Sequence, residues 1–304
     1  MSLQLPKDLQ SRSISWCLRS VEWFLRVMPR WLTSLFVEGV FPIVSMLTRK
    51  LTLIGMRNLQ FVYGDSKDKK EYERISRQLV KSIAYGMMDL IYYVDRPEEL
   101  SRITHLENEE CLKRTLGLGK GVIAVSAHLG NFPLMFIYLA QKGYKVNVII
   151  RNMRDENFSK FIHQICAKWG VNMIQTSPRK KFLKDSLAAL SRHELLFILL
   201  DEIPSIENGV KVEFLDREAI RAKGPILFLE RTSSPILPMF IGQDEKNHFK
   251  IFVEEPFEIE KKGTDLENMD KNINGLSNIV EHFVKRYPFQ WGGWLNRKMV
   301  PGDG

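Results

Sequence analysis

Three apolar runs in the sequence are each followed by polar residues that could do chemistry together. His128 follows Val122–Val125, Arg151 follows Val146–Ile150, and Asp201 and Glu202 follow Leu195–Leu200. Short apolar runs of this kind predict strands that are buried on both faces, as in parallel sheets. Because the carboxyl ends of parallel strands share one edge of a sheet, we expect these side chains to meet there.

Together these groups favour proton transfer at a hydroxyl. A neutral histidine such as His128 can take a proton from an alcohol, and a carboxylate can fix its tautomer and stabilise the imidazolium. An arginine or a helix amino terminus can hold an anionic group or a developing oxyanion. Alone, His128 would suggest a structural histidine, and Arg151 with Asp201 a structural ion pair. As a set they indicate a catalytic site.

Other catalytic schemes find less support in the sequence. Ser126 lacks a surrounding GxSxG motif, and no cysteine stands beside a candidate base. The remaining histidines show neither HExxH spacing nor paired acids, so we expect no metal and no cofactor. The glycines at 117, 119 and 121 precede a strand, whereas a phosphate-binding loop must follow one.

The order of the patterns predicts an α/β fold. Between residues 97 and 304, apolar runs alternate with helical patterns of ten to fourteen residues, which indicates a mostly parallel sheet covered by helices. Val210–Phe214 and Phe249–Val253 read as more exposed strands. Residues 1–96 read as all-helical and are expected to form an N-terminal membrane-association region, followed by an α/β domain over 97–304 that carries the candidate site.

The amino-terminal region leaves several interpretations open. Residues 14–28 have apolar side chains at helical spacing with Arg19, Glu22 and Arg26 on the other side. Residues 31–47 are nearly apolar but short for a membrane span. They could form a buried core helix pair, a helix lying in the membrane interface, or one short span. No signal-peptide pattern precedes them.

Charge bears on the partners of the chain. Its 304 residues hold 44 Lys and Arg against 36 Asp and Glu, for a formal charge of +8. The first 60 residues hold eight basic and three acidic residues, and a second basic cluster comprises Arg179, Lys180, Lys181 and Lys184. An anionic membrane surface or an acidic carrier protein would suit this charge. Nucleic acid is not expected, because stacking aromatics do not alternate with the charges. Three scattered cysteines favour a reducing compartment.

Several segments resemble one known family in their order along the chain. They are HLGNF at 128–132, Ile150-Arg151, Leu200-Asp201-Glu202, GVKVEFL at 209–215, Lys223-Gly224-Pro225, WGGWLNR at 291–297 and GMRNL at 55–59. Together they resemble motifs of the bacterial lipid A biosynthesis acyltransferases (lauroyl and myristoyl transferases) within the lysophospholipid acyltransferase superfamily. The likeness extends over nearly the whole chain.

The resemblance implies that a fatty acyl chain moves from an acyl carrier protein thioester to a hydroxyl of a membrane glycolipid or lysolipid. This would take place at the cytoplasmic face of the bacterial inner membrane. His128 would be the general base, and backbone amides near Gly130 and Asn131 would steady the oxyanion. Arg151 would hold an anionic group of the acceptor, and the acyl tail would lie in an apolar groove. Glu202, Lys223 and Gly224 are further expected binding residues.

One departure from the family pattern bears on catalysis. The family places an acid five residues after its histidine, where this chain has Pro133. Asp201 or Glu202 could replace that acid, or His128 could act alone at a lower rate, since general-base help is worth about 10²–10⁴-fold. The third possibility is a homologue without turnover that binds lipid or carrier. Asn296 stands for the family's terminal histidine, and Lys223 for a threonine.

Overall fold

A seven-stranded sheet forms the centre of the described residues, which are 23–25, 27–64, 66–151, 156–204, 209–296 and 299–300. In this computed structural model the strands lie in the order β1 (Thr104–Glu107), β9 (Phe249–Val253), β8 (Ile236–Gln243), β2 (Val122–Ser126), β5 (Leu195–Leu199), β3 (Val146–Ile150) and β4 (Asn172–Gln175). The five from β8 to β4 run parallel, while β9 is antiparallel to β8. The predicted α/β class with a mostly parallel sheet is confirmed.

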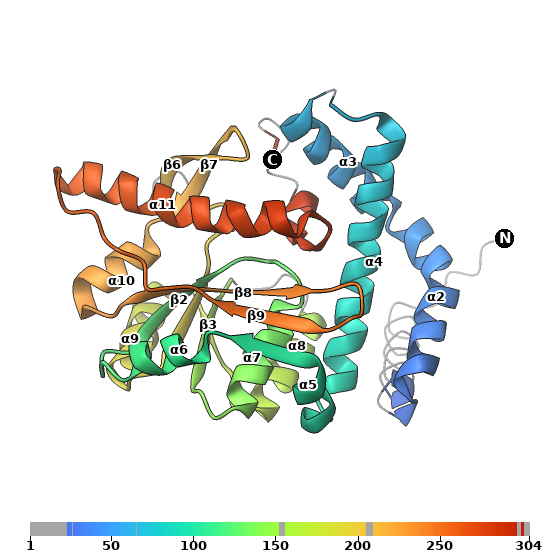
Figure 1. Cartoon of the computed structure of the whole chain (residues 1–304), viewed down its shortest axis with the longest axis horizontal. Helices are drawn as coiled ribbons and strands as arrows, with labels where there is room; N and C mark the ends of the chain where they lie inside the picture. Colours follow the sequence, from blue (N-terminus) through green and yellow to red (C-terminus); the bar gives the residue numbers. More distant parts are fainter. Residues whose placement is uncertain are drawn as a thin grey trace.

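Helices cover both faces of this sheet (Figure 1). On one face lie α5 (Pro97–Ile103), α6 (Glu109–Leu116), α7 (Phe132–Gln141) and α8 (Glu156–Lys168); on the other lie α9 (Arg179–Ser191), α10 (Gly224–Thr232) and α11 (Asp265–Arg286). Within β2, Val122 and Ala124 pack on the first layer, and Ile123 and Val125 on the second. Burial on both sides explains why the strand is continuously apolar.

Two expectations for the later strands need correction or refinement. Phe249–Val253 is not exposed, because β9 lies between β8 and β1 and buries four of its five residues. The strand at 210–214 belongs to a separate hairpin of β6 (Gly209–Phe214) and β7 (Arg217–Ala222), whose alternate residues Val210, Val212 and Phe214 are buried. Two short 3-10 helices, η2 (Pro288–Gln290) and η3 (Gly292–Leu295), follow α11.

Three N-terminal helices lie beside the sheet: α2 (Arg30–Leu47), α3 (Arg49–Tyr63) and α4 (Lys69–Tyr93) (Figure 1). The only residue of α2 that is buried is Thr33, so the interpretation of 31–47 as one helix of a buried core pair is wrong. Among the described residues α2 is the one helix long and apolar enough to cross a membrane. Most of the amphipathic pattern at 14–28 falls outside the described residues.

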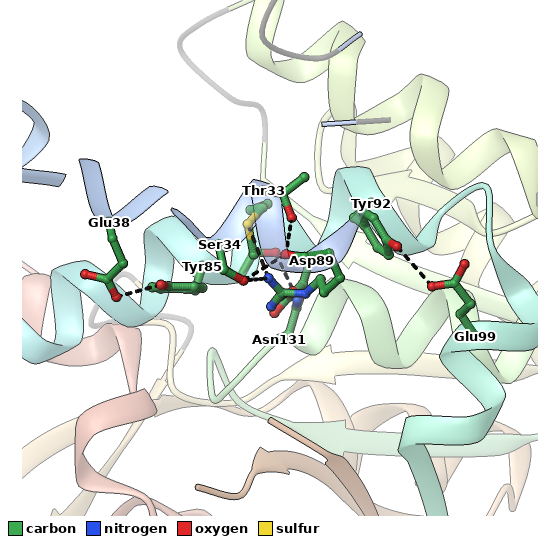
Figure 2. A network of polar contacts seen from close by, with 11 residues as sticks. Thr33, Ser34, Glu38, Tyr85, Asp89, Tyr92, Glu99 and Asn131 are labelled. Carbon is green, nitrogen blue, oxygen red and sulfur yellow. Dashed lines mark hydrogen bonds and ion pairs between the residues drawn. The ribbon is translucent and has the colours of Figure 1, made fainter. Parts of the chain in front are cut away.

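Polar contacts attach α2 to α4 (Figure 2). Arg30 Nη2 lies 2.7 Å from Asp89 Oδ1, whose side chain is buried. At the middle of α2, Glu38 accepts a hydrogen bond from the Tyr85 hydroxyl and pairs with Lys81, each at 2.7 Å. Phe36 and Val37 of α2 also pack against a small cluster that contains Met88 and Ile91 of α4. The other large apolar side chains of α2 include five that are more than half exposed: Trp31, Leu35, Ile43, Met46 and Leu47.

Candidate active site

His128 lies on the loop between β2 and α7, and the chain after α11 holds this loop in place. The His128 carbonyl accepts a hydrogen bond from Gly292 N–H (2.8 Å), and Gly130 N–H donates to the Gln290 carbonyl (2.9 Å). Gly130 has a φ of +55°, and a Cβ there would lie 2.6 Å from the Ile241 carbonyl oxygen. Only glycine fits this turn, because a side chain would be both strained and in contact with backbone.

The Asp201 carboxylate contacts both the ring and the backbone of His128. Its Oδ1 lies 3.0 Å from His128 Nδ1, and its Oδ2 accepts from the backbone N–H of His128 (3.0 Å). The indole N–H of Trp291 also donates to Oδ2, at 2.8 Å. An ionised Asp201 can only accept, so it fixes the proton of a neutral ring on Nδ1 and leaves Nε2 free to take one. The strand ends thus meet as the sequence predicted.

Charge and burial act in opposite directions on this pair. Burial by itself favours neutral forms of both groups. The Asp201 carboxylate nevertheless raises the pKa of His128 above its usual value. The His128 contacts and the Trp291 hydrogen bond hold the pKa of Asp201 below its usual value although its side chain is only 1% exposed. Asp201 is therefore ionised at neutral pH.

Glu202 and Arg151 lie on the open side of the ring. Glu202 Oε1 is 4.0 Å from His128 Nε2, beyond hydrogen-bond distance. Its other oxygen pairs with Arg151 Nε at 2.7 Å, and Arg151 also donates to the Ile203 carbonyl at 2.8 Å. Half of the Arg151 side chain is exposed, so an incoming anion could compete with Glu202 for it.

The expected roles of Gly130 and Asn131 change in part. The Gly130 N–H is already bonded to Gln290, so it is not open to an oxyanion. Asn131 caps α7 by accepting from Leu134 N–H, and its amide donates to the Gly86 carbonyl of α4 at 2.9 Å. Figure 2 shows Asn131 beside the part of α4 that also carries Asp89. This side chain joins the His128 loop to α4.

A cavity of about 860 Å³ opens at the histidine. His128, Arg151, Asp201 and Glu202 line its polar part. The rest is mainly apolar, with walls from α4, α7, α8 and the strands β3 to β5: Ile83, Met87, Leu90, Phe132, Phe136, Val148, Ile150, Ile162, Cys166, Met173 and Leu199. An apolar cavity of this size with a few convergent polar groups at one end is typical of small-ligand sites.

Lys223 and Gly224 are not among the residues that line this cavity. They begin α10, which packs beside α9 on the other layer, through Phe228 and Phe182 (ring centroids 6.0 Å apart). The structure gives no support to their predicted binding role. Pro133, at the position of the family acid, does line the cavity, in the first turn of α7. Proline is tolerated there because that turn needs no amide donor.

Two contributions to the site were not foreseen. Trp291 had a place in the family pattern but no role, and its contact with Asp201 joins residues 90 positions apart. The wall from α4 was also missed, although its apolar positions recur at helical spacing. Both arise from long-range packing, which local periodicity does not record.

Comparison with known families identifies the chain. The family model described as bacterial lipid A biosynthesis acyltransferase matches residues 6–299. The chain belongs to this family. No curated protein sequence matches it. Membership supports lipid A acyltransferase activity in general and association with membranes. Among the described residues no group of three or more His, Cys, Asp or Glu could hold a metal ion.

Proposed function

We propose that the protein transfers a fatty acyl chain from an acyl carrier protein thioester to a hydroxyl of a membrane glycolipid or lysolipid. His128 takes the proton of the acceptor hydroxyl through Nε2, and the alkoxide oxygen attacks the thioester carbonyl. Collapse of the tetrahedral intermediate forms the ester and releases the carrier thiol, which takes up the proton. Asp201 orients the ring and stabilises the imidazolium.

The observation that carries this proposal is the 3.0 Å contact between His128 Nδ1 and Asp201 Oδ1. Pro133 cannot supply the acid that the family places after its histidine, so a homologue without turnover was an open alternative. Asp201 offers a carboxylate in the orienting position from another strand. Convergent sites show that such pairs are defined by geometry rather than by sequence position.

The apolar part of the cavity suits the acyl tail. Along α7, β3 and α8 its lining runs from Phe132, Ile150 and Ile162 to Phe136, Val148 and Cys166. Phe136, Val148 and Cys166 lie about one helical turn or two strand residues further from the carboxyl edge of the sheet than the first three residues. They are therefore roughly 6 Å deeper in the cavity. Within the described part of the chain the lining of these three elements extends no deeper, so Cys166 belongs to its floor. The pKa of the Cys166 thiol is raised by burial to about 11, which argues against a nucleophilic role.

The polar part of the cavity suits an anionic acceptor or donor group. Arg151 can exchange its pairing with Glu202 for a phosphate or carboxylate, which it binds through several donors. The backbone amide of Asn131 is our candidate for steadying charge on the thioester oxygen.

The donor is argued from the charge at the start of α9. Arg179, Lys180, Lys181 and Lys184 are exposed there, and cations at a helix amino terminus oppose the helix dipole. Apart from Lys181, which pairs with Asp185 one turn further along the helix, folding of α9 therefore does not explain them. The helix begins at the same sheet edge as His128, three strands away, or about 14 Å along the sheet. An acidic carrier could dock there while its flexible arm reaches His128.

Membrane attachment is argued from α2. Trp31, Leu35, Ile43, Met46 and Leu47 are each more than half exposed, a larger group of exposed apolar side chains than a soluble surface normally carries. We place the protein at the cytoplasmic face of the bacterial inner membrane, attached peripherally or by one short N-terminal segment.

The test is acyl transfer by purified protein in vesicles that contain the acceptor. His128→Ala should abolish transfer above the uncatalysed rate, and Pro133→Glu should leave it or raise it. If His128→Ala transfers at the wild-type rate, the catalytic assignment is wrong. If the wild type binds acyl carrier protein and lipid but transfers nothing under any donor, the homologue without turnover is the correct interpretation.

A further inference from the structure

A buried arginine lies close behind the catalytic pair that we propose. Arg221 belongs to β7 and is 3% exposed. Its Nε has no hydrogen-bond partner, and its Nη1 donates to the neighbouring Ile220 carbonyl at 3.5 Å. Within the described residues the carboxylates of Asp201 and Glu281 act on the guanidinium through space and are not hydrogen-bonded to it. Burying a cation without a directly bonded anion is costly. A structural role alone would be met better by an apolar side chain.

An unbroken series of contacts leads from Arg221 to Asp201. The guanidinium carbon lies 4.1 Å from the centroid of the Phe214 ring, close enough for a cation–π contact. The Phe214 and Trp291 ring centroids are 5.5 Å apart. Trp291 then donates its indole N–H to Asp201 Oδ2 at 2.8 Å. The Phe214 and Trp291 rings thus connect the two charged groups, and both aromatic residues are only 3% exposed.

The charges that face Arg221 are those of Asp201 and Glu281. Burial lowers the pKa of Arg221 to about 10, and the two carboxylates act against this shift, so the group remains a cation at neutral pH. Glu281 is already engaged, because it accepts from Leu215 N–H at 2.7 Å and pairs with Lys285. Asp201 has no lysine or arginine in direct contact among the described residues. It is therefore the carboxylate that Arg221 is placed to balance.

We propose that Arg221 is a positioning residue: a buried counter-charge to Asp201 that keeps the carboxylate ionised without fixing the proton permanently on His128. This inference rests on the proposed general-base role of His128. A carboxylate alone raises the pKa of the ring, and a ring that stays protonated near neutral pH cannot act as a base. A cation on the far side of the carboxylate partly offsets its charge and so lowers the pKa of the ring.

The sign of the effect follows from Coulomb's law. His128 is faced by Asp201, Glu202 and Arg151, and Arg221 adds a further positive charge behind Asp201. Removing a positive charge favours the protonated ring, so loss of Arg221 should raise the pKa of His128. Removing the Asp201 charge should lower the same pKa. Opposite shifts from two buried sites distinguish an electrostatic role from general loosening of the structure.

The experiment is an NMR titration of the His128 imidazole in the full-length protein in detergent micelles, with the signals assigned by their loss in His128→Ala. Arg221→Met should move the titration up by the order of half a pH unit, and Arg221→Lys should leave it near wild type. The acid limb of the pH–rate profile should move by the same amount. Arg221→Gln replaces Arg221→Met if the latter does not fold.

If His128 titrates in Arg221→Met and Arg221→Gln with the same pKa as in the wild type, the proposal is overturned. Equal shifts of this pKa in Arg221→Met and Arg221→Lys overturn it as well. The titration needs no turnover, so it reports on Arg221 even if the protein proves not to transfer acyl groups. Unshifted titration together with normal acyl transfer would refute Arg221 alone and leave the proposed function in place.

Discussion

Asp201→Asn is the substitution that most directly tests the site. It keeps the size of the side chain but removes the charge and replaces one acceptor oxygen by an amide donor. The remaining oxygen can still accept from Trp291 and the His128 backbone, so the NH₂ group faces Nδ1. The ring must then carry its proton on Nε2. In the proposed mechanism Nε2 takes the proton of the lipid hydroxyl, so a proton already on Nε2 blocks this step.

The expected loss can be estimated from known cases. General-base help is worth about 10²–10⁴-fold, and an enforced wrong tautomer in a serine protease costs about 10⁴-fold. We therefore expect kcat to fall by about 10²–10⁴-fold, or roughly 3–5 kcal/mol of activation free energy. Because Asp201 raises the pKa of His128, the residual acid limb should also move to lower pH.

The assay measures acyl transfer from the carrier thioester to acceptor lipid in vesicles between about pH 5.5 and 9, bracketing the ordinary pKa of histidine. Asp244→Asn is a matched control, because Asp244 pairs with His248 at 3.6 Å on the surface, where both side chains are more than half exposed. It should leave kcat unchanged. If Asp201→Asn keeps kcat within about threefold of wild type, Asp201 does not orient the base, and the reasoning from the 3.0 Å contact is wrong.

Three further substitutions test other parts of the site. Cys166→Ala deepens the floor of the cavity and should shift chain preference towards donors one or two methylenes longer, by roughly 10-fold in relative kcat/KM. Lys180→Glu with Lys181→Glu should raise KM for the carrier-linked donor at least about 10-fold, with little effect on a carrier-free acyl thioester. Gly130→Ala should lower the free energy of unfolding by about 2 kcal/mol or more, measured by denaturant titration, because a β-carbon at this positive φ would meet the Ile241 carbonyl.

Each of these has a control within the same chain. Cys111 is buried in the same apolar core as Cys166 but does not line the cavity, so Cys111→Ala should leave chain preference unchanged. Lys261 and Lys262 are exposed, and their reversal should not affect KM for the carrier. Gly143 also has a positive φ but open space around its Cβ, so Gly143→Ala should be less destabilising than Gly130→Ala. If a variant and its control change the measured quantity equally, the argument for that variant is contradicted. If reversal of Lys180 and Lys181 weakens vesicle binding but leaves KM for the carrier-linked donor unchanged, the α9 cluster binds the membrane and not the carrier.

The sequence predicts the sheet well because each buried strand is visible in the sequence as a short apolar run. Val122–Val125 is apolar throughout and Val146–Ile150 is apolar except for Asn147, and burial on both faces is what that pattern means. The same logic brings Asp201 to His128, since both follow neighbouring parallel strands. It fails for Phe249–Val253, where an edge-like pattern lies inside the sheet.

What the sequence does not predict depends on contacts between distant segments. Nothing near Asp201 announces that Trp291 will donate to it or that Arg221 will lie behind the aromatic pair. Such contacts are set by how the hairpin and the chain after α11 pack onto the sheet, and each involves one residue at a time. Hydrophobic periodicity shows which face of a helix or strand is buried, but it does not show which individual residues of distant segments contact each other.

The hold of residues 288–295 on the His128 loop also has a consequence for biosynthesis. These residues leave the ribosome long after α2, which carries the exposed apolar side chains that we propose attach the protein to a membrane. On that proposal the nascent chain would be anchored while His128 still lacks its Trp291-held partner Asp201 and Gly130 N–H still lacks the Gln290 carbonyl. The proposed site would then be completed only after the chain had reached the membrane.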